Sequence, residues 1–214
     1  MVREGYPWIL VPLAAGLAAV VLYLFWMTPV LLALAALLLL LAAFMAYFFR
    51  DPRRTTPAER DLVIAPADGR VTRVEKLSDG DAQSPTVVSI FLSPFDVHIN
   101  RSPIAGTVVD VTYTKGRFTA ATSDNASLVN EQNALTIKGE KITLVCKQIA
   151  GVLARRIVCW KQPGDRLEMG ERFGLIKFGS RTDLVLPPEV EVLVRVGARV
   201  RGGVTIIGRC GNGD

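Results

Sequence analysis

A long uncharged segment near the N-terminus is the feature that most constrains how this chain can fold. Residues 7–49 contain no charged side chain, although the chain of 214 residues carries a formal net charge of +5. About 20 helical residues cross a bilayer, so this segment is too long for a single span. It divides at "MTP", where Thr28 can cap a second helix that begins at Pro29. The sequence therefore predicts a transmembrane helical hairpin, with spans near 7–26 and 30–49.

The residues that flank the two spans predict an orientation. The alternative to a transmembrane hairpin is a signal peptide, but a signal peptide would have a shorter apolar core and a small-residue cleavage site. The basic run "RDPRR" (50–54) follows the second span, whereas the turn between the spans is uncharged. The positive-inside rule then places both termini, and residues 51–214, on the cytoplasmic side of the cell membrane. Aromatic residues, which favour the interface, stand near the span ends at Trp8, Trp26, Tyr47 and Phe48.

Residues 51–214 read as a mainly β domain with its own core. Short runs such as "TVVSIFLS" and "ITLVCKQIAG" are separated by Gly, Pro and Asp. Two pairs of segments repeat: "PADGRV" with "PIAGTV", and "GDRLEMGERFGLI" with "GARVRGGVTIIG". We therefore expect two similar β units that resemble lipoyl- or biotinyl-carrier domains. No lysine stands in a hairpin as a swinging-arm carrier requires, so the resemblance concerns the fold alone.

The cysteines show no paired spacing, which favours free thiols in a reducing compartment. They are Cys146, Cys159 and Cys210. The sequence contains neither a metal-ligand spacing nor a phosphate-binding glycine loop, so we expect no metal site, and no nucleic-acid partner. Whether the protein forms a homo-oligomer is left open.

A Gly-Ser pair interrupts an otherwise apolar run in "GERFGLIKFGSRTDLVLP". Gly179 and Ser180 could mark a β-bulge. They also suit attack of the serine hydroxyl on the preceding carbonyl, because glycine lets the backbone distort. The resulting ester can eliminate to dehydroalanine and then give a pyruvoyl group. The G-x-S-x-G elbow of a serine hydrolase is absent.

Two further residues are candidates for chemistry. His98 is the single histidine of the chain and lies in "FLSPFDVHINRSPIAGTV", among polar and turn-forming residues. Asp68 lies in the Asp-Gly turn of "APADGRV". A structural histidine and ordinary turn chemistry are the alternatives for these two residues.

These blocks, together with "NEQNALTI", "IAGVLARRIVCW" and "VRVGARVRGGVTIIG", resemble the phosphatidylserine decarboxylase proenzymes of the short bacterial form, over most of residues 60–208. The resemblance implies cleavage between Gly179 and Ser180 into a larger β chain and a small α chain. It implies a covalent pyruvoyl cofactor made from Ser180, whose ketone forms a Schiff base with phosphatidylserine and accepts electrons as CO₂ leaves. The product would be phosphatidylethanolamine. It also implies a role for Asp68 in self-processing and a position for His98 near the substrate.

The sequence departs from the family pattern at one position. Longer members carry a second histidine three residues after the first, where this chain has Arg101. Arginine cannot act as a general base near neutral pH. Either His98 or Asp68 then takes over in self-cleavage, or backbone strain and oxyanion stabilisation contribute more.

Other functions are also compatible with the sequence. The substrate could be another serine phospholipid, such as archaetidylserine. A non-enzymatic, membrane-anchored adaptor with a lipoyl-like fold would explain the repeats but would leave Gly179 and Ser180 without a purpose. The basic runs "RDPRR" and "ARR" (154–156) could attract anionic lipid or form solvated faces. Residues 115–133 could cover the site or form an ordinary connection.

Overall fold

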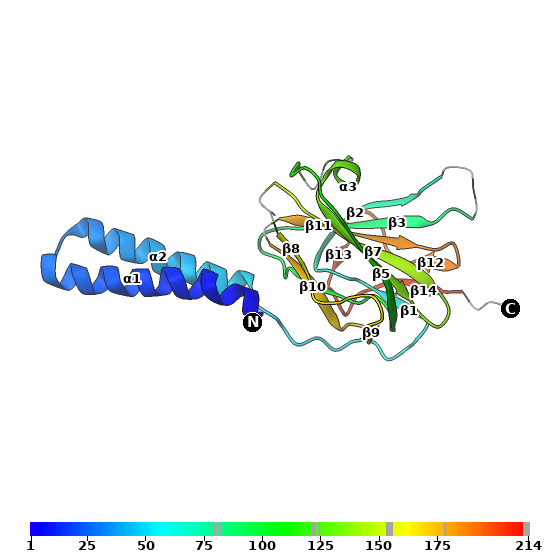
Figure 1. The fold of residues 1–214 in the computed structure, drawn as a ribbon, viewed down its shortest axis with the longest axis horizontal. Coiled ribbons are helices and arrows are strands. Elements are labelled where there is room, and N and C mark those ends of the chain that lie inside the picture. The colour runs from blue at the N-terminus through cyan, green and yellow to red at the C-terminus, as the bar shows by residue number, and fades with distance from the viewer. Residues whose placement is uncertain are drawn as a thin grey trace. The chain divides into compact units, whose positions relative to one another are not determined.

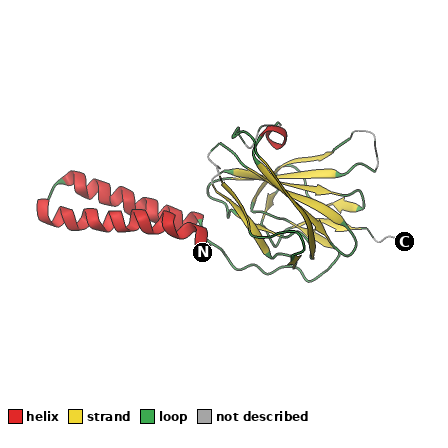
Figure 2. Cartoon of the chain, viewed as in Figure 1, coloured by secondary structure: helices red, strands yellow, loops and turns green. Residues whose placement is uncertain are grey.

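The protein consists of an apolar helical unit followed by a mainly β unit (Figures 1 and 2). Contacts divide the chain into two compact units, Met1–Arg53 and Arg54–Asp214. This confirms the expected order of two apolar N-terminal helices and a mainly β domain. The computed structural model describes residues 1–78, 81, 83–120, 123, 125–152, 156–177 and 179–211.

The N-terminal unit is a hairpin of two long helices. Its elements are η1 (Arg3–Gly5), α1 (Tyr6–Trp26) and α2 (Pro29–Phe48). Met27 ends α1 in a left-handed conformation with φ 50°, and Thr28 takes the extended N-cap conformation but makes no side-chain capping bond. The helices approach closely at Gly16, where an added Cβ would lie 3.0 Å from the side chain of Leu39. By length and composition, both helices could cross a membrane.

The described strands of the second unit form three sheets. The largest has the order β13-β2-β3-β11-β7-β6-β5-β9, and the smaller ones have the orders β1-β14-β12 and β4-β10-β8. A short helix, α3 (Ala126–Val129), precedes β6. The strand bounds are β1 Leu62–Ile64, β2 Gly69–Lys76, β3 Thr86–Leu92, β4 Ile99–Arg101, β5 Gly106–Thr114, β6 Gln132–Lys138, β7 Thr143–Ile149, β8 Arg156–Cys159, β9 Arg166–Leu167, β10 Arg172–Lys177, β11 Ser180–Leu186, β12 Val190–Val192, β13 Arg199–Val200 and β14 Ile206–Cys210.

Strand β11 lies at the centre of the large sheet, between β3 and β7 (Figure 1). It pairs with β3 from Ser180 opposite Leu92 to Leu186 opposite Thr86. All of its residues are buried except Val185, which is partly buried. Leu184 and Leu186 belong to the main hydrophobic core. A strand paired on both edges and covered on both faces holds its first residue firmly, and that residue is Ser180.

The first sequence repeat has the same local structure in both copies. In "PADGRV" and "PIAGTV" the glycine begins a strand, β2 in one copy and β5 in the other. The two copies also bond to each other reciprocally: Ile64 N donates to Pro103 O at 3.0 Å, and Arg101 N donates to Pro66 O at 2.9 Å. A shift of 37 residues (103 − 66) superimposes the two segments.

The second repeat matches just as closely. Gly197 N donates to Val71 O at 2.8 Å, and Gly164 N donates to Val108 O at 2.8 Å, so each copy joins the corresponding copy of the first repeat. The glycines adopt left-handed conformations, which other residues avoid, at nearly equal φ: 95° at Gly164 and 91° at Gly197, then 81° at Gly170 and 80° at Gly203.

The sheets reflect this repetition throughout. In the large sheet, β13-β2-β3-β11 is related to β9-β5-β6-β7 by an approximate twofold axis between β11 and β7, and β1-β14-β12 likewise corresponds to β4-β10-β8. The domain is therefore built from two similar halves: one is the continuous segment from β4 to β10, and the other combines the early strands β1 to β3 with the late strands β11 to β14. The likeness of these halves to carrier domains stays a prediction.

Candidate active site

The Gly-Ser pair lies where the chain passes from one sheet to another. Lys177 ends β10 and Ser180 begins β11, so Gly179 lies between two strands and not at a bulge within one. Gly179 has φ 56°, a left-handed conformation that favours glycine. An added Cβ at Gly179 would meet nothing within 4 Å. The position therefore favours glycine because of its backbone conformation and not because space is short. Phe178 lies outside the described residues.

The Ser180 hydroxyl is enclosed. Ser180 is 0% exposed, and its Oγ has no hydrogen-bond partner among the described residues. A buried hydroxyl without a partner costs stability, on the order of 1–3 kcal/mol. Ser89 Oγ in β3 is also buried without a partner among the described residues, so what distinguishes Ser180 is the carbonyl of a left-handed glycine immediately before it.

His98 is buried just before β4 and beside β10. It is 3% exposed, and its carbonyl accepts from Ile176 N at 3.2 Å. Its Nδ1 lies 3.0 Å from the carbonyl oxygen of Asp96. A carbonyl can only accept, so Nδ1 carries the hydrogen, and in the neutral ring Nε2 carries the lone pair. The ring is thereby fixed in one tautomer.

A hydrogen bond two residues further along relates His98 to Ser180. Asn100 Nδ2 donates to Thr182 Oγ1 at 3.0 Å, between β4 and β11. Alternate side chains of an extended segment share a face. Ser180 is therefore on the face of Thr182 in β11, and His98 stands two residues before Asn100, just outside β4. His98 and Ser180 both stand at the end where β10 leads into β11.

Asp68 lies at the same end of the large sheet but is already engaged. Arg70 of β2 and Arg181 of β11 both pair with Phe91 of β3, so the starts of β2 and β11 lie two strand spacings apart, or about 10 Å. Arg54 Nη2 donates to Asp68 Oδ2 at 2.7 Å, and Gly202 N donates to Asp68 Oδ1 at 2.8 Å. Both carboxylate oxygens are thus acceptors in charge-assisted bonds.

Arg101 stands at the position of the second family histidine and joins the two halves of the domain. Its Nη1 donates to Gly170 O at 3.1 Å, in addition to the backbone bond to Pro66. An added Cβ on Gly203 would lie 2.7 Å from Arg101 Cδ, so the side chain packs closely on this glycine. These contacts give Arg101 a structural role.

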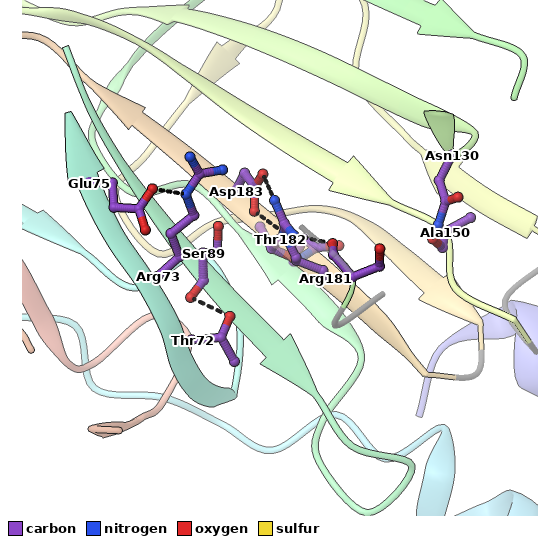
Figure 3. A network of polar contacts seen from close by, with 11 residues as sticks. Thr72, Arg73, Glu75, Ser89, Asn130, Ala150, Arg181, Thr182 and Asp183 are labelled. Carbon is purple, nitrogen blue, oxygen red and sulfur yellow. Dashed lines mark hydrogen bonds and ion pairs between the residues drawn. The ribbon is translucent and has the colours of Figure 1, made fainter. Parts of the chain in front are cut away.

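A buried ion pair flanks Ser180 on the other face of β11. Arg181 Nε and Nη2 donate to Asp183 at 2.6 and 2.7 Å, and both side chains are under 5% exposed. Figure 3 shows the two side chains pointing toward each other, with Thr182 between them in sequence. Arg181 Nη1 also donates to Ser123 O at 3.3 Å, so this residue of the segment 115–133 contacts the strand that begins with Ser180.

The two basic runs of the sequence, "RDPRR" and "ARR", differ in the solvent exposure of the arginines that the structure describes. Arg54 is 13% exposed and paired with Asp68, so within "RDPRR" this cation does not face solvent. In "ARR", Ala154 and Arg155 lie outside the described residues, and Arg156 is exposed at the start of β8.

The thiols are not activated. Burial raises the pKa of Cys146, and the nearby Asp183 carboxylate adds to the shift. Burial also raises the pKa of Cys159 above its ordinary value. Both remain protonated near neutral pH and are poor nucleophiles. Within the described ranges, no cluster of three or more His, Cys, Asp or Glu could hold a metal ion.

The family model of phosphatidylserine decarboxylase matches residues 41–208. The chain belongs to this family. Each of three bacterial relatives bears the name phosphatidylserine decarboxylase proenzyme. The one from Symbiobacterium thermophilum is 48% identical over 215 residues (97% of this chain, 94% of the relative). That from Solibacter usitatus is 47% identical over 196 residues (92% of each chain), and that from Geobacter sulfurreducens is 44% identical over 211 residues (96% and 94%).

The region matched to the decarboxylase family contains Asp68, His98, Gly179 and Ser180. The structure brings His98 and Ser180 to one end of facing segments and leaves Asp68 in an ion pair. Sequence reasoning missed Asn100 and Thr182, which link those segments, and the Arg54 partner of Asp68. Polar residues inside apolar strand patterns were the available signal, since a buried polar side chain needs a partner.

Proposed function

We propose that this chain is a membrane-anchored proenzyme that cleaves itself between Gly179 and Ser180 and then converts phosphatidylserine to phosphatidylethanolamine and CO₂. The observation that carries the proposal is the buried Ser180 hydroxyl, which follows a left-handed glycine in a chain of the decarboxylase family. A non-enzymatic adaptor would have no use for this arrangement.

In the proposed cleavage, Ser180 Oγ attacks the carbonyl carbon of Gly179, and the C–N bond breaks. The hydroxyl proton passes to the departing nitrogen, and the product is an ester. Loss of the Cα proton then breaks the Cβ–O bond, which frees the Gly179 carboxylate and leaves dehydroalanine at position 180. Tautomerisation and hydrolysis release ammonia and leave a pyruvoyl carbonyl. The left-handed Gly179 supports the first step, because it gives the backbone the freedom to bring the carbonyl to Oγ.

The surroundings of residue 180 fit such a group. Ser180 is fully buried at the start of a strand that is paired on both edges. A pyruvoyl group of similar size would keep that position and would be shielded from water. When formed, it supplies the electron-accepting carbonyl that decarboxylation of an amino acid requires.

His98 is proposed to deliver the proton to the carbon that loses CO₂. Asp96 O fixes the hydrogen on Nδ1, so Nε2 is the atom that can take up and release a proton. Imidazole suits this role, because its ordinary pKa is close to neutral pH. The shared end of β4 and β11 supports a short path from this ring to residue 180.

Asp68 is proposed to serve self-cleavage by fixing structure and not as a free base. Its two oxygens already accept hydrogen bonds from Arg54 and Gly202, so the carboxylate is held in a fixed structural position. The pair ties the start of β2 to Arg54, at the boundary with the N-terminal unit, and to the turn before β14.

We also propose that α1 and α2 cross the cell membrane and that residues 54–214 lie on its cytoplasmic side. Phosphatidylserine resides in the bilayer, so an anchored enzyme avoids extracting acyl chains. The uncharged turn between the helices and the basic residues after α2 support this orientation. We also propose that the two halves resemble carrier domains, which their twofold repetition supports.

The test is the intact mass of the purified protein. The wild type should contain an α chain of 35 residues (214 − 179) with a blocked N-terminus, and it should release CO₂ from phosphatidylserine. Ser180→Ala should remain a single inactive chain. A full-length wild-type chain that still decarboxylates phosphatidylserine would exclude this mechanism.

A further inference from the structure

Four polar side chains form a continuous buried chain behind Ser180. Asn133 Nδ2 donates to Gln148 Oε1 at 3.1 Å, Gln148 Nε2 donates to Asn100 Oδ1 at 2.9 Å, and Asn100 Nδ2 donates to Thr182 Oγ1 at 3.0 Å. Asn100, Gln148 and Thr182 are 0% exposed and Asn133 is 4% exposed. The four residues come from β6, β7, β4 and β11, so the chain crosses from the large sheet to a small one.

We propose that this amide chain is a positioning device for catalysis, in which Asn100 holds the segment that carries His98 against the strand that begins with Ser180. The inference rests on the proposed function of those two residues. Asn100 follows His98 by two residues, and Thr182 follows Ser180 by two residues. The bond between Asn100 and Thr182 therefore fixes how far His98 can move from residue 180.

The other half of the domain shows that the fold does not need an amide at this position. The shift of 37 residues places Val63 at the position of Asn100. Val63 pairs with Gly208 and Asn100 pairs with Gly174, and in both ladders the register shifts at the next residue along β1 or β4. Val63 is 0% exposed and belongs to the main core. The same backbone site thus accepts an apolar side chain.

This comparison separates a structural role from a positioning role. Burying three amides and one hydroxyl removes them from water, and only complete pairing offsets that cost. A valine would fill the site without the cost, as Val63 does. The half that retains the polar chain is the one that carries His98, whereas the equivalent of His98 in the other half (98 − 37) is Asp61. The buried polar chain therefore occurs in the half that carries the candidate catalytic residue His98, and the backbone fold that both halves share does not require it.

The variant Asn100→Val installs the residue that the other half already uses. Gln148 keeps Val158 O as an acceptor at 3.3 Å and Asn133 as a donor, so its amide stays paired. We expect the variant to fold. Small displacements of reacting groups can cost about 10²-fold in rate. We therefore expect cleavage at Gly179–Ser180 to slow at least about tenfold, and kcat of the cleaved enzyme to fall with KM unchanged.

The experiment follows chain cleavage and CO₂ release separately in full-length protein reconstituted in vesicles that contain phosphatidylserine. Thr182→Val removes the hydroxyl from the other end of the bond and should reproduce both effects. Thr182→Ser keeps the hydroxyl and should restore most of the cleavage rate. Val63→Ala, at the equivalent site of the other half, is the control: it should lower the unfolding temperature without a selective loss of kcat.

Three results would overturn the inference. Wild-type cleavage and kcat in Asn100→Val would show that the amide positions nothing. Failure of Asn100→Val to fold would show that the fold needs the amide and that the comparison with Val63 is wrong. Rate losses that follow unfolding temperature equally in all variants, Val63→Ala included, would show a purely structural role. The wild type is measured alongside: if it stays whole, the proposed function itself fails.

Discussion

The ion pair between Arg54 and Asp68 should behave as one energetic unit. Its side chains are 13% and 15% exposed, and its N···O distance is 2.7 Å. Removing one partner of a fully buried pair costs about 3–5 kcal/mol, and an exposed pair contributes at most about 1 kcal/mol. The partial exposure places Asp68→Asn between these limits, at about 2–4 kcal/mol. For a domain of this size, that lowers the unfolding midpoint by about 4–16 °C.

A double-mutant cycle measures the pair directly. Arg54→Met, Asp68→Asn and the double variant are compared in a Ser180→Ala background, so that none can cleave and each is one chain. Unfolding is followed by near-ultraviolet circular dichroism. The double variant should be more stable than the sum of the single losses predicts, by about 1.5 kcal/mol or more, because the second change removes a charge that the first left without its partner.

Two further results decide the argument. Single losses that add within about 0.5 kcal/mol would show that the pair is not coupled and refute the reasoning. Arg209→Met is the control, since the Arg209–Glu59 pair spans 3.3 Å with side chains 55% and 68% exposed, and its loss should hardly change the midpoint. With Ser180 restored, Asp68→Asn should impair cleavage more than turnover by enzyme already cleaved.

Two other predictions concern the proton donor and the topology. In cleaved enzyme, His98→Ala should lower CO₂ release by about 10² or more, and His98→Asn, which can still donate to Asp96 O but cannot titrate, should be equally impaired; near-normal turnover in either variant would assign the proton to another group. Proteases added outside intact cells should leave residues 54–214 uncut, whereas digestion of this unit from outside would reverse the proposed orientation.

The helical hairpin and the β-rich character were predictable because they depend on local properties. Forty-three uncharged residues and an internal "MTP" determine two helices almost by themselves. The repeats were also visible, because left-handed glycines such as Gly164 and Gly197 leave a direct mark in the sequence. The pairing of the halves was not, since a strand order such as β3-β11-β7 depends on contacts between distant segments.

Some residues of the candidate site were likewise predictable from the sequence, and others were not. Gly179, Ser180 and His98 stand in distinctive short blocks and could be named from the sequence together with the family resemblance. The partner of Asp68 could not, because Arg54 lies outside its block and reads as one of several juxtamembrane cations. Asn100 was equally hidden. Its neighbours suggest a turn, and only the fold brings it to Thr182.

Because β11 lies at the centre of the large sheet, refolding after denaturation should differ between the uncleaved and the cleaved protein. Before cleavage, β11 to β14 are tethered to the remaining strands, and folding is unimolecular. After the proposed cleavage between Gly179 and Ser180, the same strands would form a separate short chain, with β11 between β3 and β7, β13 paired to β2 and β14 paired to β1. Refolding the mature protein then requires two chains to meet, and its yield would depend on concentration. The uncleaved precursor can fold as a single chain, whereas the two chains of the cleaved protein would have to associate to form the same sheet again.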